Sequence, residues 1–168
     1  MPFHIPYSAS VSRYNPISTR RTGLAALLLM LAGACGPRQP RPIAFGEESC
    51  RHCHMTVADG RYAAEAITRT AKIHVFDDIA CLTAWLAENG GVMASLWVAD
   101  FAAPDQWLAA DSAVYLQNDT VHTPMASGLA ALRPGREADS VQALLGGRLR
   151  SWPEVLAMPH GHAPGLAR

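Results

Sequence analysis

YAAEAITRTAKIHVFDDIACLTAWLAENGG, residues 62–91, contains the clearest secondary-structure pattern in this sequence. Residues 62–69 and 72–76 alternate apolar and polar side chains, which predicts two strands joined as a hairpin. Asp77 and Asp78 follow, and short carboxylates accept hydrogen bonds from the first amides of a helix, so both are predicted as helix caps. The apolar spacing after them predicts the helix itself, and two glycines end it.

The second half of the chain shows a similar order of elements. The expected elements are strands at 94–101, 107–108, 113–116, 128–132 and 148–150, a helix at 136–145 and a capped helix start at 151–154. Each of the two longer helices ends at a Gly-Gly pair, and the pairs lie 56 residues apart. The predicted fold class is therefore α+β, with two β-β-α-β units that share a core.

The first 34 residues have the composition of an export signal. They contain no Asp or Glu, and an apolar run at residues 23–34 follows the arginine pair Arg20 and Arg21. The run is too short for an ordinary spanning helix and ends in small residues directly before Cys35. We therefore predict that residues 1–34 are a lipoprotein signal peptide with an N-terminal extension, and that Cys35 is the lipidated residue.

The rest of the chain divides by composition. Residues 35–45 are rich in proline and predict a lipid-anchored flexible tether, 46–155 form the domain, and 156–168 are expected to be a flexible tail. Removal of the signal takes away three arginines and leaves 11 Lys+Arg against 14 Asp+Glu, a net charge of −3. This charge does not favour a nucleic-acid partner. No second apolar run reaches spanning length, so the lipid alone is expected to hold the protein to the membrane.

Residues 50–55, CRHCHM, hold the densest group of metal-binding side chains in the sequence. The two-residue gap between Cys50 and Cys53 lets both thiolates converge on one soft ion. Met55 adds a thioether, a soft neutral donor that favours Cu(I) over Zn²⁺. The stretch therefore predicts a Cu(I) site.

Other interpretations of this pair remain open. In an oxidising compartment the two thiols can close a disulfide. Together with His54 they also form C-x-x-C-H, the minimal haem c attachment signature, which would make the chain an electron-transfer protein. The strands that follow are not typical of small haem c domains, which are mainly helical, and copper is favoured. A general role in handling thiols or metals is a further alternative.

The sequence context also predicts roles for residues outside this stretch. Met125, in a Pro-Met loop between predicted strands, is a candidate distant ligand, while His122 beside it is assigned to solvent. Cys81 lies in an apolar helix and is predicted to be a buried structural thiol. Asp77 and Asp78 have no neighbour in sequence that completes an acid–base site, so we expect no enzymatic activity.

Taken in order, these residues resemble the nitrous-oxide reductase accessory lipoprotein family, NosL, over about residues 45–150. The matching features are the lipobox Cys35, the C-x-x-C-x-M of residues 50–55, Phe76-Asp77-Asp78 followed by Cys81, then Asp100, Trp107, Tyr115 and Pro124-Met125 with Gly128. The chain departs from the family where His54 and Ala126 stand, because members usually have glycine at the first position and often at the second.

The resemblance implies a function and a site. Members are periplasm-facing copper chaperones, anchored by lipid, with the outer membrane as the expected location. They bind Cu(I) and supply it to nitrous-oxide reductase together with an ABC-type accessory complex. Their fold is a pair of β-β-α-β units, similar in shape to organomercurial lyase. Carried over by position, the copper ligands would be Cys50, Cys53, Met55 and Met125.

The substitution Cys35→Ser is expected to release the protein from the membrane fraction or to block its processing, because no thiol then remains to receive diacylglycerol. Fractionation of cells and the mass of the processed chain measure both effects. Cys53→Ser, which removes a thiol outside the lipobox, is the matched control and should stay in the membrane fraction. Unchanged membrane partition of the Cys35 variant would count against lipidation.

Overall fold

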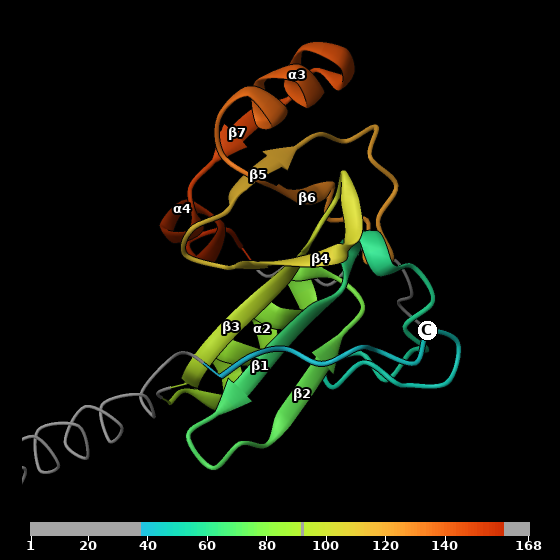
Figure 1. Ribbon diagram of the computed structural model, residues 1–168, viewed down its shortest axis with the longest axis vertical. Coiled ribbons are helices and arrows are strands. Elements are labelled where there is room, and N and C mark those ends of the chain that lie inside the picture. Colours follow the sequence, from blue (N-terminus) through green and yellow to red (C-terminus); the bar gives the residue numbers. More distant parts are fainter. Residues whose placement is uncertain (1–37, 92, 160–168) are drawn as a thin grey trace, which may run out of the picture. The chain divides into compact units, whose positions relative to one another are not determined.

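The computed structural model describes residues 38–91 and 93–159, all within the unit Pro37–Arg168 (Figure 1). The signal peptide, Cys35 and the last nine residues of the tail lie outside the described residues. In the described part no helix has both the length and the apolarity to cross a membrane.

The first half forms a four-stranded antiparallel sheet with the strand order β2-β1-β3-β4. Its elements are the 3-10 helix η2 (Gly60–Tyr62), β1 (Ala64–Thr68), β2 (Ile73–Phe76), α2 (Ile79–Asn89), β3 (Met93–Asp100) and β4 (Ala103–Ala109). Strand β1 begins two residues later than the alternation predicted, because Asp59 caps the 3-10 turn that precedes it. Strand β4 is longer than the two residues expected for it.

The second half forms a three-stranded antiparallel sheet with the order β6-β5-β7. Its elements are β5 (Val114–Gln117), β6 (Leu129–Leu132), α3 (Arg136–Leu145), β7 (Arg148–Arg150) and α4 (Trp152–Leu156). In each half the first strand is flanked by the second strand and by the strand that follows the helix. The predicted α+β fold with two β-β-α-β units is confirmed.

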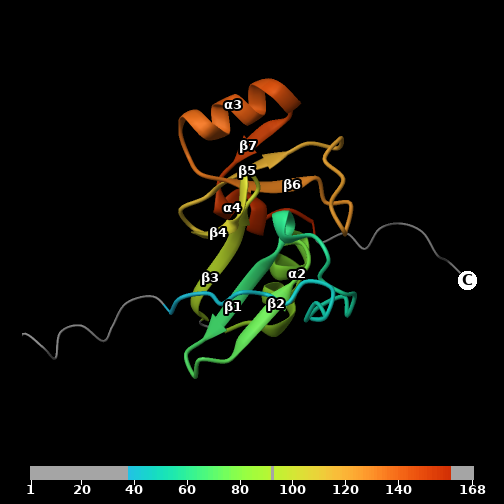
Figure 2. The ribbon, with the colours of Figure 1, turned by 45° about the vertical axis from the view of Figure 1, so that its right-hand side comes forward.

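One core joins the two halves. Helix α2 packs against β1 and β2 of the first sheet and against β6 of the second (Figures 1 and 2). The buried cluster contains Phe76 and Leu82 from the first half and Tyr115 and Trp152 from the second. Each large apolar side chain buried in this way contributes about 1.5–3 kcal/mol to folding, so neither half is expected to be stable without the other.

Residues 38–45, assigned from composition to the tether, lie against the domain. The Arg38 carbonyl accepts hydrogen bonds from Ser95 Oγ at 2.7 Å and Trp97 Nε1 at 2.8 Å, and Ile43 is buried. The composition missed this because a single buried isoleucine among prolines has no periodicity. At the other end, Met158 packs on the core, so the first residues of the assigned tail also contact the domain.

Asp78 connects the beginning of α2 to the loop between β5 and β6. Its Oδ1 accepts from the amide of Ala80 at 2.8 Å and from Ser127 Oγ at 2.8 Å. Its Oδ2 accepts from the amide of Met125 at 2.9 Å. The predicted cap at Asp78 is therefore confirmed, and the same fully buried carboxylate also holds the Pro-Met loop against the helix.

Asp78→Ala is expected to lower the free energy of unfolding by about 3 kcal/mol, because it removes a helix cap and leaves two loop donors without their charged acceptor. Urea denaturation measures the change. Asp119→Ala, at an exposed aspartate, is the matched control and should stay within about 0.5 kcal/mol of the wild type. Equal stability of the two variants would show that the carboxylate does not fasten the loop.

Candidate metal centre

The C-x-x-C segment is a tight turn held against the first sheet. Ser49 and Thr56 form an isolated antiparallel bridge, the Cys50 amide donates to the Met55 carbonyl at 2.8 Å, and the His54 amide donates to the Cys50 carbonyl at 3.1 Å. The Arg51 amide donates to the Val75 carbonyl at 2.8 Å, which fastens the turn to β2. Since β2 ends at Phe76, these bonds hold the turn beside the junction between β2 and α2.

Three cysteines and one aspartate meet at this junction. One ligand atom from each of Cys50, Cys53, Asp77 and Cys81 lies within 4.8 Å of the others. Asp77 stands in the connection between β2 and α2, and Cys81 lies in the first turn of α2. Two stretches that are separate in the sequence, residues 50–53 and 77–81, therefore supply a single group of soft and hard metal donors.

The cluster is mostly buried and incompletely hydrogen-bonded. Cys50, Cys81 and Asp77 are each 1% exposed, whereas Cys53 is half-buried. Cys53 Sγ donates to Asp77 Oδ2 at 3.3 Å, but Asp77 Oδ1 has no partner among the described residues. A buried carboxylate oxygen without a partner is costly, and a cation bound among these atoms would remove that cost.

The thiols do not titrate alike. The hydrogen bond from the Cys81 thiol lowers the pKa of Cys50 to about 7, and the same bond raises the pKa of Cys81 far above its usual range. Burial raises the pKa of Cys53 to about 12. The cluster therefore holds one readily formed thiolate, and a bound metal ion would have to displace the remaining protons.

The prediction that Asp77 caps the helix is wrong, because the cap is Asp78. Cys81 is buried, as predicted, and the sequence missed that both residues lie in the cluster. Helical side chains tilt toward the N-terminus of their helix, so a cysteine in the first turn points back to the strand that precedes it. The sequence pattern that could have predicted the cluster is therefore a cysteine three residues after the helix cap Asp78 and four after Asp77.

The two predicted methionine ligands are held near the cluster by the backbone. Met55, two residues after Cys53, has a 45% exposed side chain. Met125 is half-buried, and Asp78, the neighbour of Asp77, binds its amide. Gly128 shapes this loop, because it has φ of 65° and a Cβ there would lie 2.5 Å from the Asn118 carbonyl oxygen. The assignment of both methionines as ligands stays a prediction.

The two histidines considered from the sequence, His54 and His122, lie outside the cluster of three cysteines and Asp77. His54 and His122 are both exposed. Covalent haem attachment through C-x-x-C-H needs both sulfurs at a surface beside a large porphyrin, whereas Cys50 is buried in the core against Cys81. The geometry therefore disfavours the haem interpretation.

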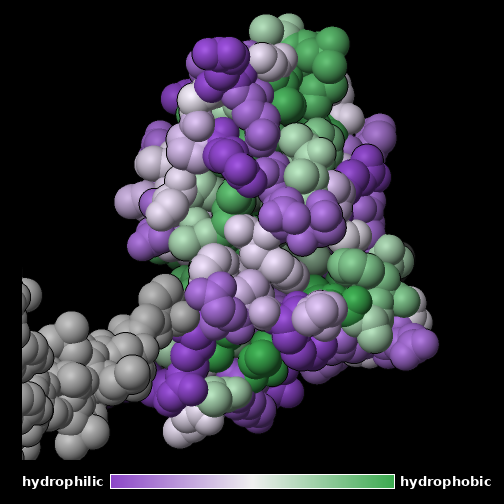
Figure 3. All heavy atoms as spheres, viewed as in Figure 1, coloured by the Kyte–Doolittle hydropathy of each residue, from purple (hydrophilic) through white to green (hydrophobic). Residues whose placement is uncertain are grey.

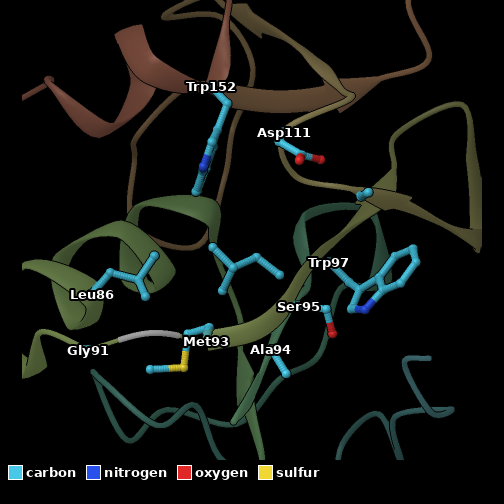
Figure 4. Close-up of a pocket in the computed structure, with 10 residues that line it drawn as sticks. Leu86, Gly91, Met93, Ala94, Ser95, Trp97, Asp111 and Trp152 are labelled. Atoms are coloured by element: carbon cyan, nitrogen blue, oxygen red, sulfur yellow. The ribbon is translucent and has the colours of Figure 1, made fainter. Parts of the chain in front are cut away.

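A separate cavity of about 460 Å³ contains none of the cysteines. It lies between the end of α2, the first part of β3 and Trp152, with apolar walls that include Leu86 and Met93 (Figure 4). Asp111 is the one carboxylate in its lining. The donor set needed for a soft metal ion is therefore at the β2–α2 junction and not in this cavity.

The comparisons with known proteins show the family of the chain and a similar fold. The model of the NosL family matches residues 42–158. The chain belongs to the NosL family. A crystal structure of the copper chaperone NosL from Shewanella denitrificans is similar to this fold, with a TM-score of 0.61, 18% sequence identity, and coverage of 71% of this chain and 96% of that one. The comparison with curated proteins gives no match.

His54 and Ala126, which stand where members of the NosL family often have glycine, both have a left-handed backbone conformation. His54 has φ of 63° and Ala126 has φ of 52°. A Cβ disfavours this conformation by about 1–2 kcal/mol, which explains why glycine suits these positions. Here the hydrogen bonds of the two turns hold the unfavourable conformation.

His54→Gly is expected to raise the free energy of unfolding by up to about 1 kcal/mol, because the relief of strain exceeds the added entropy of the unfolded chain. Thermal unfolding of the reduced protein measures it. His52→Gly, at a neighbouring position without positive φ, is the matched control and should be destabilising. A loss of stability in both variants would contradict the strain at His54.

Proposed function

We propose that this chain is a copper chaperone, which binds Cu(I) at the β2–α2 junction and hands it to a partner. The observation that carries the proposal is the approach of three cysteine sulfurs and one carboxylate to within 4.8 Å of one another. Membership of the NosL family supports it, as does the fold shared with a protein that is itself a copper chaperone.

The chemistry of the donors favours Cu(I) as the cargo. Thiolate and thioether sulfur are soft ligands that select monovalent copper. Cys50 and Cys53 are the thiolate ligands, and Met55 and Met125 are proposed as thioether ligands. Each copper–sulfur bond can be replaced in turn by a bond to a ligand of the partner protein. The ion therefore leaves by ligand exchange, and no bond of an organic substrate is broken.

The partially open side of the site suits transfer. Cys53 is half-buried, and Phe45 and Met55 in the same region of the chain are 47% and 45% exposed. Figure 3 shows apolar side chains on the surface over the loop that contains these residues, at the right of the view. A partner that docks on this apolar surface would bring its own ligands next to Cys53.

The proposed client and location rest on the family resemblance. We propose that the copper is delivered for assembly of nitrous-oxide reductase, together with an ABC-type accessory complex. Lipidation of Cys35 would hold the domain on the periplasm-facing side of the cell envelope, at the outer membrane. The net charge of −3 expected for the processed chain is compatible with a role that involves no nucleic acid.

The reduced, purified protein is expected to bind one Cu(I) per chain, and the double variant Cys50→Ser, Met55→Ala is expected to lose tight binding, because two soft ligands are removed together. Competition with a chromophoric Cu(I) chelator under nitrogen measures affinity and stoichiometry. Met93→Ala, which removes a thioether at the separate cavity, is the matched control and should bind as the wild type does. Stoichiometric tight binding by the double variant would refute the assigned site.

A further inference from the structure

The metal cluster has an inner and an outer side. Cys50, Cys81 and Asp77 are almost completely buried, whereas Cys53 is half-buried and Met55 is exposed. The outer side contains the thiol and thioether expected to exchange ligands with a partner. The inner side contains two sulfurs, whose atoms lie within 4.8 Å of each other, and a carboxylate oxygen that has no partner among the described residues.

The spacing of the inner atoms fits one bound ion. Two sulfurs that bind one ion at about 2.3 Å lie about 3.8 Å apart in a tetrahedral site and about 4.6 Å apart in a linear site. The four ligand atoms here lie within 4.8 Å of one another. The upper limit on these separations is therefore close to the sulfur–sulfur distance that one bound ion requires.

We propose that the cargo has a second, inner position between the sulfurs of Cys50 and Cys81, and that Cys53 is the shared ligand that passes the ion between this position and the outer one at Met55. The inference rests on the proposed function, and it adds Cys81 as a metal ligand. It also divides the site into a holding position, closed to water, and an exchange position, open to a partner.

Binding of a monovalent ion at the inner position involves loss of two protons and no change of oxidation state. When Cu(I) binds, the thiols of Cys50 and Cys81 release their protons to solvent, and two thiolates with one Cu(I) carry a single net negative charge. Cys81 lies in the first turn of α2, where the unpaired amides and the helix dipole stabilise negative charge. The thiol of Cys53 keeps its hydrogen bond to Asp77 in this state.

A divalent ion at the inner position would have a larger set of ligands than Cu(I). Zn²⁺ and Cd²⁺ accept oxygen as well as sulfur, so the free Oδ1 of Asp77 becomes a ligand together with three thiolates. The full set of Cys50, Cys53, Cys81 and Asp77 is then four-coordinate. Cd²⁺ is therefore a probe that counts how many thiolates the cluster places on one ion.

The first test compares the inner and outer ligands by kinetics. The reduced full chain, solubilised in detergent, is loaded with Cu(I), and transfer to a chromophoric chelator is followed by stopped flow. Cys81→Ser is expected to weaken affinity by at least about tenfold and to speed release. Met55→Ala is expected to slow transfer, with less than about a threefold change in affinity. An unchanged affinity and release rate in Cys81→Ser would overturn the inner position.

The second test needs no variant to fold. The intensity of the sulfur-to-cadmium charge-transfer band of the wild type, titrated with Cd²⁺ alone, is expected to correspond to three thiolates, and a value that corresponds to two would overturn the role of Cys81. If the wild type binds no Cu(I) but gives the three-thiolate cadmium band, the proposed function fails and the inner site stands. If Cu(I) binds tightly and the band corresponds to two thiolates, the proposed function stands and the inner site fails.

Discussion

The carboxylate of Asp78 is the interaction on which the site depends. It begins α2 by accepting from the Ala80 amide, and it holds the Pro-Met loop by accepting from Met125 and Ser127. Because it is fully buried, the cost of its desolvation is offset only while these three donors stay in place. The beginning of α2 and the loop from the second half of the chain are thus held together, directly beside Asp77.

The cost of burying sulfur and carboxylate together is what makes the neighbouring cluster a candidate metal site. A structural core would have filled the β2–α2 junction with apolar side chains, as it does around Phe76 and Leu82. Instead, three thiols surround a carboxylate with one free oxygen, an arrangement that gains little stability without a cation. Binding of a cation at the cluster is therefore expected to stabilise the folded domain.

The two β-β-α-β units have the same strand order but different junctions between strand and helix. In the first unit, Asp78 caps α2 and Cys81 follows in its first turn, whereas in the second unit Gly135 precedes α3 and provides no side-chain cap. No cysteine follows Cys81 in the sequence. The second unit is joined to this junction by the bond from its Met125 amide to Asp78 and by the shared core, so the architecture is repeated and the cysteine cluster is not.

Local sequence signals were enough to predict the strands, the helices and two of the clustered cysteines. Alternation, glycine stops and a capping carboxylate predicted the order of strands and helices, since these signals act within a few residues. The spacing of Cys50 and Cys53 indicated a soft metal for the same reason. The folded chain was needed to show that Asp77 and Cys81 lie beside these cysteines, and that residues 38–45 pack on the domain. The cluster depends on how the turn, the end of β2 and the first turn of α2 are packed together. The two cysteines of the turn lie 24 to 31 residues before Asp77 and Cys81, and a local sequence pattern cannot predict contacts over that separation.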